Sequence, residues 1–120
     1  MEPRIDRTEF GSVTVDGQSF ERDIIIHLGG QIRKRKKKLS SALYGTSHII
    51  SLEEAQYVYE QGAERLLVGA GQFGLVELSA EAAAYFDEQG CRVDLLPMKE
   101  AIEAWNEAQG AVLGLFHVTC

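Results

Sequence analysis

The sequence has few cysteines and no long apolar run, and each shortage excludes a class of protein. Two cysteines, Cys91 and Cys120, are too few for a disulfide framework in a chain of 120 residues. No apolar run approaches the length of a membrane span, and the N-terminal residues lack the apolar core of a secretory signal. We therefore expect a cytoplasmic protein that does not enter the membrane.

Common catalytic motifs are also missing. The sequence contains no HExxH, CxxC or GxSxG pattern and no Walker loop, so we expect no catalytic residue set, no cofactor and no metal. His48, His117 and Cys120 would offer three zinc ligands with an open fourth position, but no pair has local metal spacing. A Cys120 thiol activated by His117 is disfavoured, since residues i and i+3 of a strand point to opposite faces.

The charge is unevenly distributed. The net charge is −6, yet residues 33–38 supply six of the twelve basic residues, which leaves six basic against eighteen acidic residues, or −12, elsewhere. Such a surface repels nucleic acid outside this segment. The basic run is either a nucleic-acid contact or a solvated edge strand or loop whose lysines discourage aggregation. We favour the second, because no aromatic residue interrupts the run to stack on bases.

The composition of the whole chain, with 45% apolar and 25% charged residues, is typical of a globular protein. We expect one domain over residues 1–120. The first third predicts an antiparallel meander: a strand over Ile5–Phe10, a hairpin turning at Asp16-Gly17, and a central strand over Asp23–Leu28. A polar strand then begins at Gln31-Ile32, and Leu39–Gly45 is expected to be a loop.

The rest of the chain predicts strands alternating with helices. Ser51 and Glu54 have the spacing of a capping box, in which Glu54 reaches back to the Ser51 N–H and opens a helix that ends at Gly62. Ser79 is expected to cap a second helix, and a third, which carries Trp105 as a core anchor, runs from Pro97 to Gly110. The intervening strands are expected at Leu66–Val68, Cys91–Leu96 and Ala111–Val118. The expected fold is α/β, with three layers (β+α/β/α), a mixed central sheet, and an N-terminal antiparallel meander followed by β-α-β-α-β.

Gly69, Gly71 and Gly74 have the spacing of a dinucleotide-binding fingerprint. That fingerprint requires a helix to start within the glycine turn, so that its N-terminal amides meet the pyrophosphate. Here the helix is expected only after Ser79, five residues beyond Gly74. We therefore predict a tight turn rather than a phosphate cradle.

Small polar residues at the expected strand ends form a candidate ligand-binding cleft, because ligands of open α/β sheets gather beyond the carboxyl ends of the strands. The alternative is that the histidines are hydrogen-bonded residues that fix loop geometry. The candidate cleft residues are Ser47, His48, Gly69, Gly71, Gln72, His117 and Thr119.

The order of several short segments resembles a small α/β domain family of unknown function. This family includes the mitochondrial complex I assembly factor 3 group and the adipogenesis-associated domain proteins. The resemblance implies the three-layer fold, no established activity for the bacterial and archaeal members, and assembly through protein contacts for the mitochondrial ones. The segments are Gly45-Thr46-Ser47-His48, Val68-Gly69-Ala70-Gly71-Gln72-Phe73-Gly74, Leu78-Ser79-Ala80-Glu81-Ala82, Ala101-Ile102 with Asn106, and Leu115-Phe116-His117-Val118-Thr119-Cys120.

Together these observations favour a non-enzymatic module that binds an unidentified protein partner, and they leave homo-oligomerisation open. The alternative is a small-ligand or enzymatic cleft at Gly69–Gly74 with His48 and His117. Binding of nucleic acid through residues 33–38 is a third hypothesis, and the acidic remainder of the chain weighs against it.

Overall fold

The computed structural model describes residues 3–119. The elements are β1 (Ile5–Glu9), β2 (Ser12–Val15), β3 (Gln18–Phe20), β4 (Ile24–Ile26), β5 (Ile32–Lys34), α1 (Lys38–Tyr44), β6 (Ile49–Ile50), α2 (Leu52–Val58), β7 (Arg65–Ala70), β8 (Glu77–Leu78), α3 (Ala80–Glu88), β9 (Arg92–Leu96), α4 (Met98–Glu107) and β10 (Val112–His117). Among these described elements, no helix is long and apolar enough to cross a membrane.

The central sheet has the strand order β5-β4-β10-β7-β9. Strand β10 pairs in parallel with β7 and antiparallel with β4, while β9 pairs in parallel with β7, so the sheet is mixed. Strands β1, β2 and β3 form a separate antiparallel sheet, and β6 pairs in parallel with β8. The predicted mixed α/β fold is confirmed, although the expected meander is divided between two sheets.

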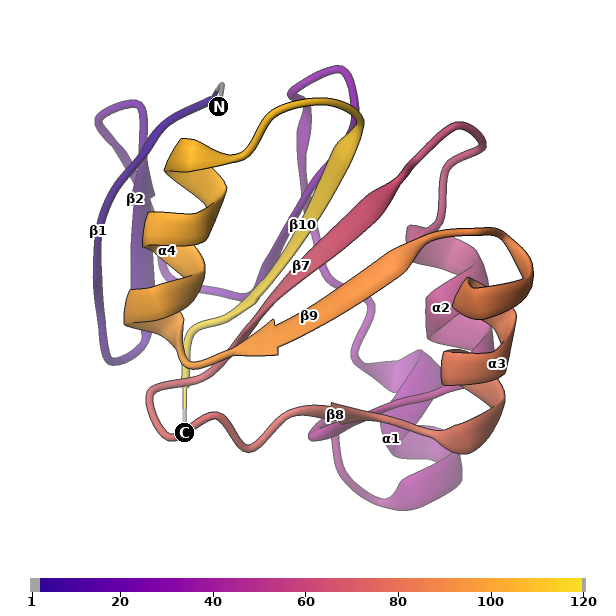
Figure 1. The fold of residues 1–120 in the computed structure, drawn as a ribbon. Helices are drawn as coiled ribbons and strands as arrows, with labels where there is room; N and C mark the ends of the chain where they lie inside the picture. Colours follow the sequence, from indigo (N-terminus) through magenta and orange to yellow (C-terminus); the bar gives the residue numbers. More distant parts are fainter. Residues whose placement is uncertain (1–2, 120) are drawn as a thin grey trace.

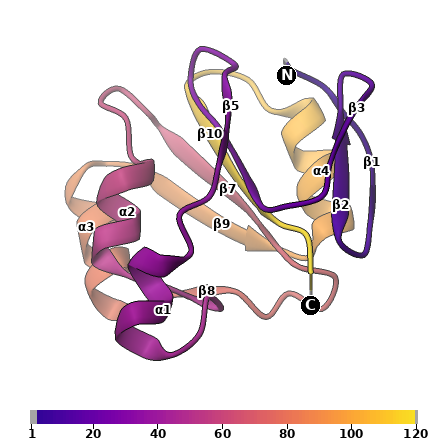
Figure 2. The ribbon, with the colours of Figure 1, turned by 180° about the vertical axis from the view of Figure 1, so that it is seen from behind.

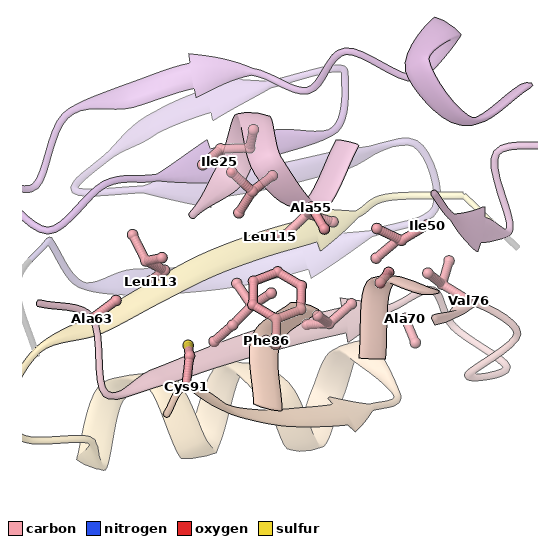
Figure 3. Packing of buried hydrophobic residues seen from close by; sticks show 14 residues of the cluster. Ile25, Ile50, Ala55, Ala63, Ala70, Val76, Phe86, Cys91, Leu113 and Leu115 are labelled. Atoms are coloured by element: carbon pink, nitrogen blue, oxygen red, sulfur yellow. The ribbon is translucent and has the colours of Figure 1, made fainter. Parts of the chain in front are cut away.

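Helices α2 and α3 lie on one side of the central sheet, and α4 with β1 and β2 lies on the other (Figure 1). An apolar cluster fills the space on each side. On one face, α2 and α3 pack on the sheet, and Phe86 and Cys91 lie in the same cluster as Leu113 and Leu115 of β10 (Figure 3). On the other face, α4 packs beside β1 and β2, with fully buried Trp105 in the same cluster. The alternate burial of successive β7 residues in these two clusters explains its uninterrupted apolar run.

Local signals in the sequence are confirmed at the hairpin and at the glycine segment. Asp16 and Gly17 have φ of 47° and 82°, as a two-residue hairpin turn requires. The chain turns after β7, and α3 begins only at Ala80, where the Ser79 hydroxyl accepts a hydrogen bond from the Ala82 N–H at 3.0 Å. The glycine segment is therefore a bend, and no helix begins within it.

Three local predictions were wrong. Residues expected to form a loop make α1, a seven-residue helix with no side-chain N-cap, which Gly45 ends at a φ of 68°. The α2 helix ends at Val58, with Tyr59 as its C-cap, rather than at Gly62. Ser51 does cap α2, but its own N–H donates to Ser40 Oγ at 2.9 Å, because the Glu54 side chain points to Arg35 instead.

Candidate functional site

Four of the seven predicted cleft residues lie together around His117. The rings of His48 and His117 meet edge to face with centroids 5.3 Å apart. Thr119 Oγ1 lies 3.2 Å from His117 Nε2. The Ser47 carbonyl accepts a hydrogen bond from Arg35 Nη2 at 2.7 Å, which places this segment beside the same group.

The glycine-loop members have other surroundings. Gly69 lies inside β7 opposite Phe116, and the Gly71 carbonyl accepts from the Met98 N–H at 3.0 Å. Gln72 lines a separate cavity of about 540 Å³ beside α4. The glycine loop therefore packs against the start of α4, and the described contacts do not connect Gln72 with the histidines.

Gly69 is required by packing. A Cβ atom added there would lie 2.3 Å from Met98 Sδ and 2.7 Å from Phe116 Cδ1. We expect Gly69→Ala to lower the free energy of unfolding by about 1–3 kcal/mol, as overpacking typically does. Urea denaturation measures the loss. Gly29→Ala is the matched control, since a Cβ there meets no atom within 4 Å, and it should change stability by less than about 0.5 kcal/mol. Equal effects at the two positions would contradict the packing role.

The centre of the polar cluster is Arg35, which sequence analysis missed. Its guanidinium is fully buried between two carboxylates. It donates to Glu54 through Nε and Nη2, at 2.5 and 3.0 Å, and to Asp23 Oδ2 through Nη1 at 2.9 Å. Burial disfavours the charged guanidinium, but the bonds and charges of Glu54 and Asp23 outweigh this effect and raise the pKa of Arg35.

Hydrogen bonds extend the cluster to α1 and to the end of β10. Ser40 Oγ donates to Glu54 Oε1 at 2.5 Å and so holds α1 against α2. His117 Nδ1 lies 2.7 Å from Asp23 Oδ2, and the Val118 N–H donates to Asp23 Oδ1 at 3.0 Å. The cluster therefore joins α1, α2, β10 and the segment around β4 and β5, with nearly every polar atom paired inside the protein.

The pKa of Asp23 has the clearest consequence for stability. Burial raises the pKa, but hydrogen bonds from His117 and Val118 and the charges of His117 and Lys37 lower it from 3.8 to about 2. Because the folded pKa lies below the unfolded one, the Asp23 carboxylate stabilises the fold above about pH 4, and this contribution is lost as the pH falls towards 2.

We expect the loss from this carboxylate to be about 2 kcal/mol between pH 5 and pH 2. Chemical denaturation of the wild type and of Asp23→Asn across this range measures it. The variant should be less stable at pH 5 but should lose about 2 kcal/mol less than the wild type on acidification. Parallel pH profiles for the two proteins would show that Asp23 does not carry this dependence.

A line of three groups runs through the cluster: the Asp23 carboxylate, the His117 imidazole and the Thr119 hydroxyl. The short contact to Asp23 favours a proton on Nδ1, which leaves Nε2 to accept the hydrogen bond from Thr119 Oγ1. The same order of groups activates hydroxyl nucleophiles in hydrolases.

Cys120, the other nucleophile considered from the sequence, lies outside the described residues. Within residues 3–119, no group of three His, Cys, Asp or Glu side chains is placed to hold a metal ion.

The basic run lines a groove of about 650 Å³. The basic run includes the edge strand β5, as predicted. However, Arg35 at the centre of the run is buried, and Lys38 begins α1. Arg22 comes from the connection before β4 and Tyr57 from α2, and Lys36 Nζ lies 4.4 Å above the Tyr57 ring. The groove is lined by Arg22, Asp23, Arg33, Lys34, Arg35, Lys36, Lys37, Lys38, Leu39 and Tyr57.

Solved structures with this fold are known. A conserved hypothetical protein from Pyrococcus horikoshii is 33% identical, with a TM-score of 0.88 over 98% of this chain and 99% of that one. The protein MT938 is also 33% identical, with a TM-score of 0.80 over 98% of both chains. An Mth938-like domain from Bordetella pertussis, at 16% identity, has a TM-score of 0.65 over 97% of this chain and 85% of that one, and it shares the fold.

No curated protein matches the chain. A family model described as a protein of unknown function (DUF498/DUF598) matches residues 5–113, most of the chain. The chain therefore belongs to the DUF498/DUF598 family.

Proposed function

We propose that the chain is a non-enzymatic protein-interaction module that acts in the manner of an assembly factor. The observation that carries this proposal is the contrast between the candidate cleft and the surface. In the cleft, Arg35, Asp23, Glu54 and His117 bond to one another, so a substrate would have to displace internal partners. At the surface, large apolar side chains are half or more exposed: Phe10, Leu43, Phe73 and Leu75.

The family resemblance supports the same function. The complex I assembly factor 3 group, which has similar segments in the same order, acts through protein contacts. Phe73 is 74% exposed and Leu75 is 51% exposed, and the two side chains project from one loop. Exposed aromatic and aliphatic side chains of this kind are common in protein interfaces.

A second candidate is a hydrolytic site. The alignment of Asp23, His117 and Thr119 favours it, because His117 would remove the proton from Thr119 Oγ1 while Asp23 holds the imidazole. This candidate requires a carbonyl substrate to reach Thr119 beside His48.

Two measurements on the purified chain separate these functions. In the first, the chain is used as bait in a pulldown, and cross-linking and sedimentation of the chain with each recovered protein should give a saturable complex of fixed stoichiometry. In the second, screening with small metabolites and activated esters should give neither turnover nor a gain in stability. A bound ligand at about 100 times its Kd would raise the free energy of unfolding by roughly 2.7 kcal/mol. Turnover that Thr119→Val abolishes, without a saturable protein complex, would overturn the interaction function in favour of the hydrolytic one.

A further inference from the structure

Within the described residues 3–119, the outer edge of β5 has backbone groups that are free to pair with another strand. The Arg35 N–H donates to the Asp23 carbonyl at 3.2 Å, and the His27 N–H donates to that of Gln31 at 2.9 Å. In antiparallel pairs, hydrogen-bonded and non-hydrogen-bonded residues alternate, so Arg33 also bonds to β4. The N–H and C=O groups of Ile32 and Lys34 therefore point outward from the sheet. Strand β5, which is labelled in Figure 2, is an edge strand of the central sheet.

The charge beside this edge is uncompensated. Arg22, Arg33, Lys34, Lys36 and Lys38 are exposed. Within residues 3–119, none of these five has a carboxylate oxygen within 4.0 Å, whereas Lys37 lies 3.5 Å from Asp23 and Arg35 is fully paired. Because the rest of the sequence is strongly acidic, this groove is where a negatively charged partner would be attracted.

The combination of a free strand edge and one sign of charge selects the partner. We propose that the groove along β5 binds an extended acidic segment of a partner protein, which adds to the central sheet beside β5. This inference rests on the proposed interaction function and names the class of partner. Alternate side chains of the segment would face the two sides of the edge and meet Arg33 on one side and Lys34 on the other.

The same charges disfavour pairing of the edge with a second copy of itself. Lysine and arginine on an edge strand repel an identical edge, and this protects sheets from aggregation. An acidic strand turns that repulsion into attraction. The edge therefore discriminates between partners by charge while the backbone hydrogen bonds supply the pairing.

The test uses the full chain and a ten-residue peptide in which pairs of glutamates alternate with pairs of valines, so that a bound strand presents glutamate on both faces. On binding, amide hydrogen exchange at Ile32 and Lys34 should slow by about tenfold or more, while Arg33, whose amide already faces β4, should change little. The same peptide with lysine in place of every glutamate should not bind. Slowing at neither Ile32 nor Lys34, or tighter binding of inorganic triphosphate or oligouridylate than of the acidic peptide, would overturn strand addition.

Variants separate charge from backbone pairing. Arg33→Glu/Lys34→Glu should weaken peptide binding by about tenfold or more, and Lys99→Glu, an exposed lysine on α4, should not. Lys34→Pro removes one outward N–H at an edge position that tolerates proline, so it should bind about two- to tenfold more weakly than Lys34→Ala. Equal affinities for these two would contradict backbone pairing. A saturable protein complex that survives Arg33→Glu/Lys34→Glu would overturn the groove proposal and leave the interaction function standing.

Discussion

Replacing Glu54 with alanine should lower the free energy of unfolding by about 3–5 kcal/mol, since it leaves a buried guanidinium without its main partner. Glu54 accepts two hydrogen bonds from Arg35 and one from Ser40, and its side chain is fully buried. Asp23 remains as a second carboxylate but already bonds to His117 and Val118. Urea denaturation at neutral pH measures the loss.

The neighbouring residue supplies the control. Glu53 lies in the same first turn of α2 but is exposed, so Glu53→Ala should change stability by less than about 0.5 kcal/mol. A double variant, Arg35→Met with Glu54→Leu, removes both buried charges of the pair, and its loss should be smaller than the sum of the two single losses. Additive losses would show that the two side chains do not act as one buried pair.

Truncation of Trp105 should have an effect of similar size. Its side chain is fully buried, its ring lies edge to face with Phe116 at 5.8 Å, and Nε1 donates to the Pro3 carbonyl at 2.7 Å. Trp105→Ala should lower the free energy of unfolding by about 3–5 kcal/mol through the cavity it leaves. Trp105→Phe should lose less, because it keeps most of the apolar contact and gives up the hydrogen bond and the smaller part of the ring system.

A matched aromatic truncation tests whether burial is the cause. Phe73 is 74% exposed, so Phe73→Ala should leave thermal and urea stability nearly unchanged while removing a large apolar side chain from the surface. If the two truncations cost the same, Trp105 would not be the anchor of the layer between α4 and the sheet. A stacking role for Trp105 requires an accessible ring, which the structure does not provide.

The predictable part of the fold came from patterns within a few residues. The apolar run of β7, the hairpin at Asp16-Gly17 and the cap at Ser79 each depend on neighbours in the sequence, and all three are present. The α1 helix lacks such a signal, because it has no capping side chain and its buried Ser40 is held by Ser51 and Glu54. Contacts with α2 fix this helix, and local propensity does not report them.

The polar cluster could be predicted only in part for the same reason. Seven residues at strand ends were expected to converge, and four of them, Ser47, His48, His117 and Thr119, do lie near one another. The glycine-loop members, Gly69, Gly71 and Gln72, lie elsewhere. Arg35 stands within a run of six basic residues, where nothing in the local sequence separates a buried guanidinium from solvated ones. Its partners Asp23 and Glu54 lie 12 and 19 residues away, so only the fold reveals the pairing.

The position of β10 has a consequence for biosynthesis. This strand lies between β4 and β7 in the sheet, yet it follows both in the chain. On the ribosome, β4 can pair with β5 and β7 with β9, but the edges of β4 and β7 that face each other across β10 stay unpaired until residues 112–117 emerge. Until then these edges are open to chaperones and to other nascent chains, which makes the interval before β10 emerges the time of greatest aggregation risk.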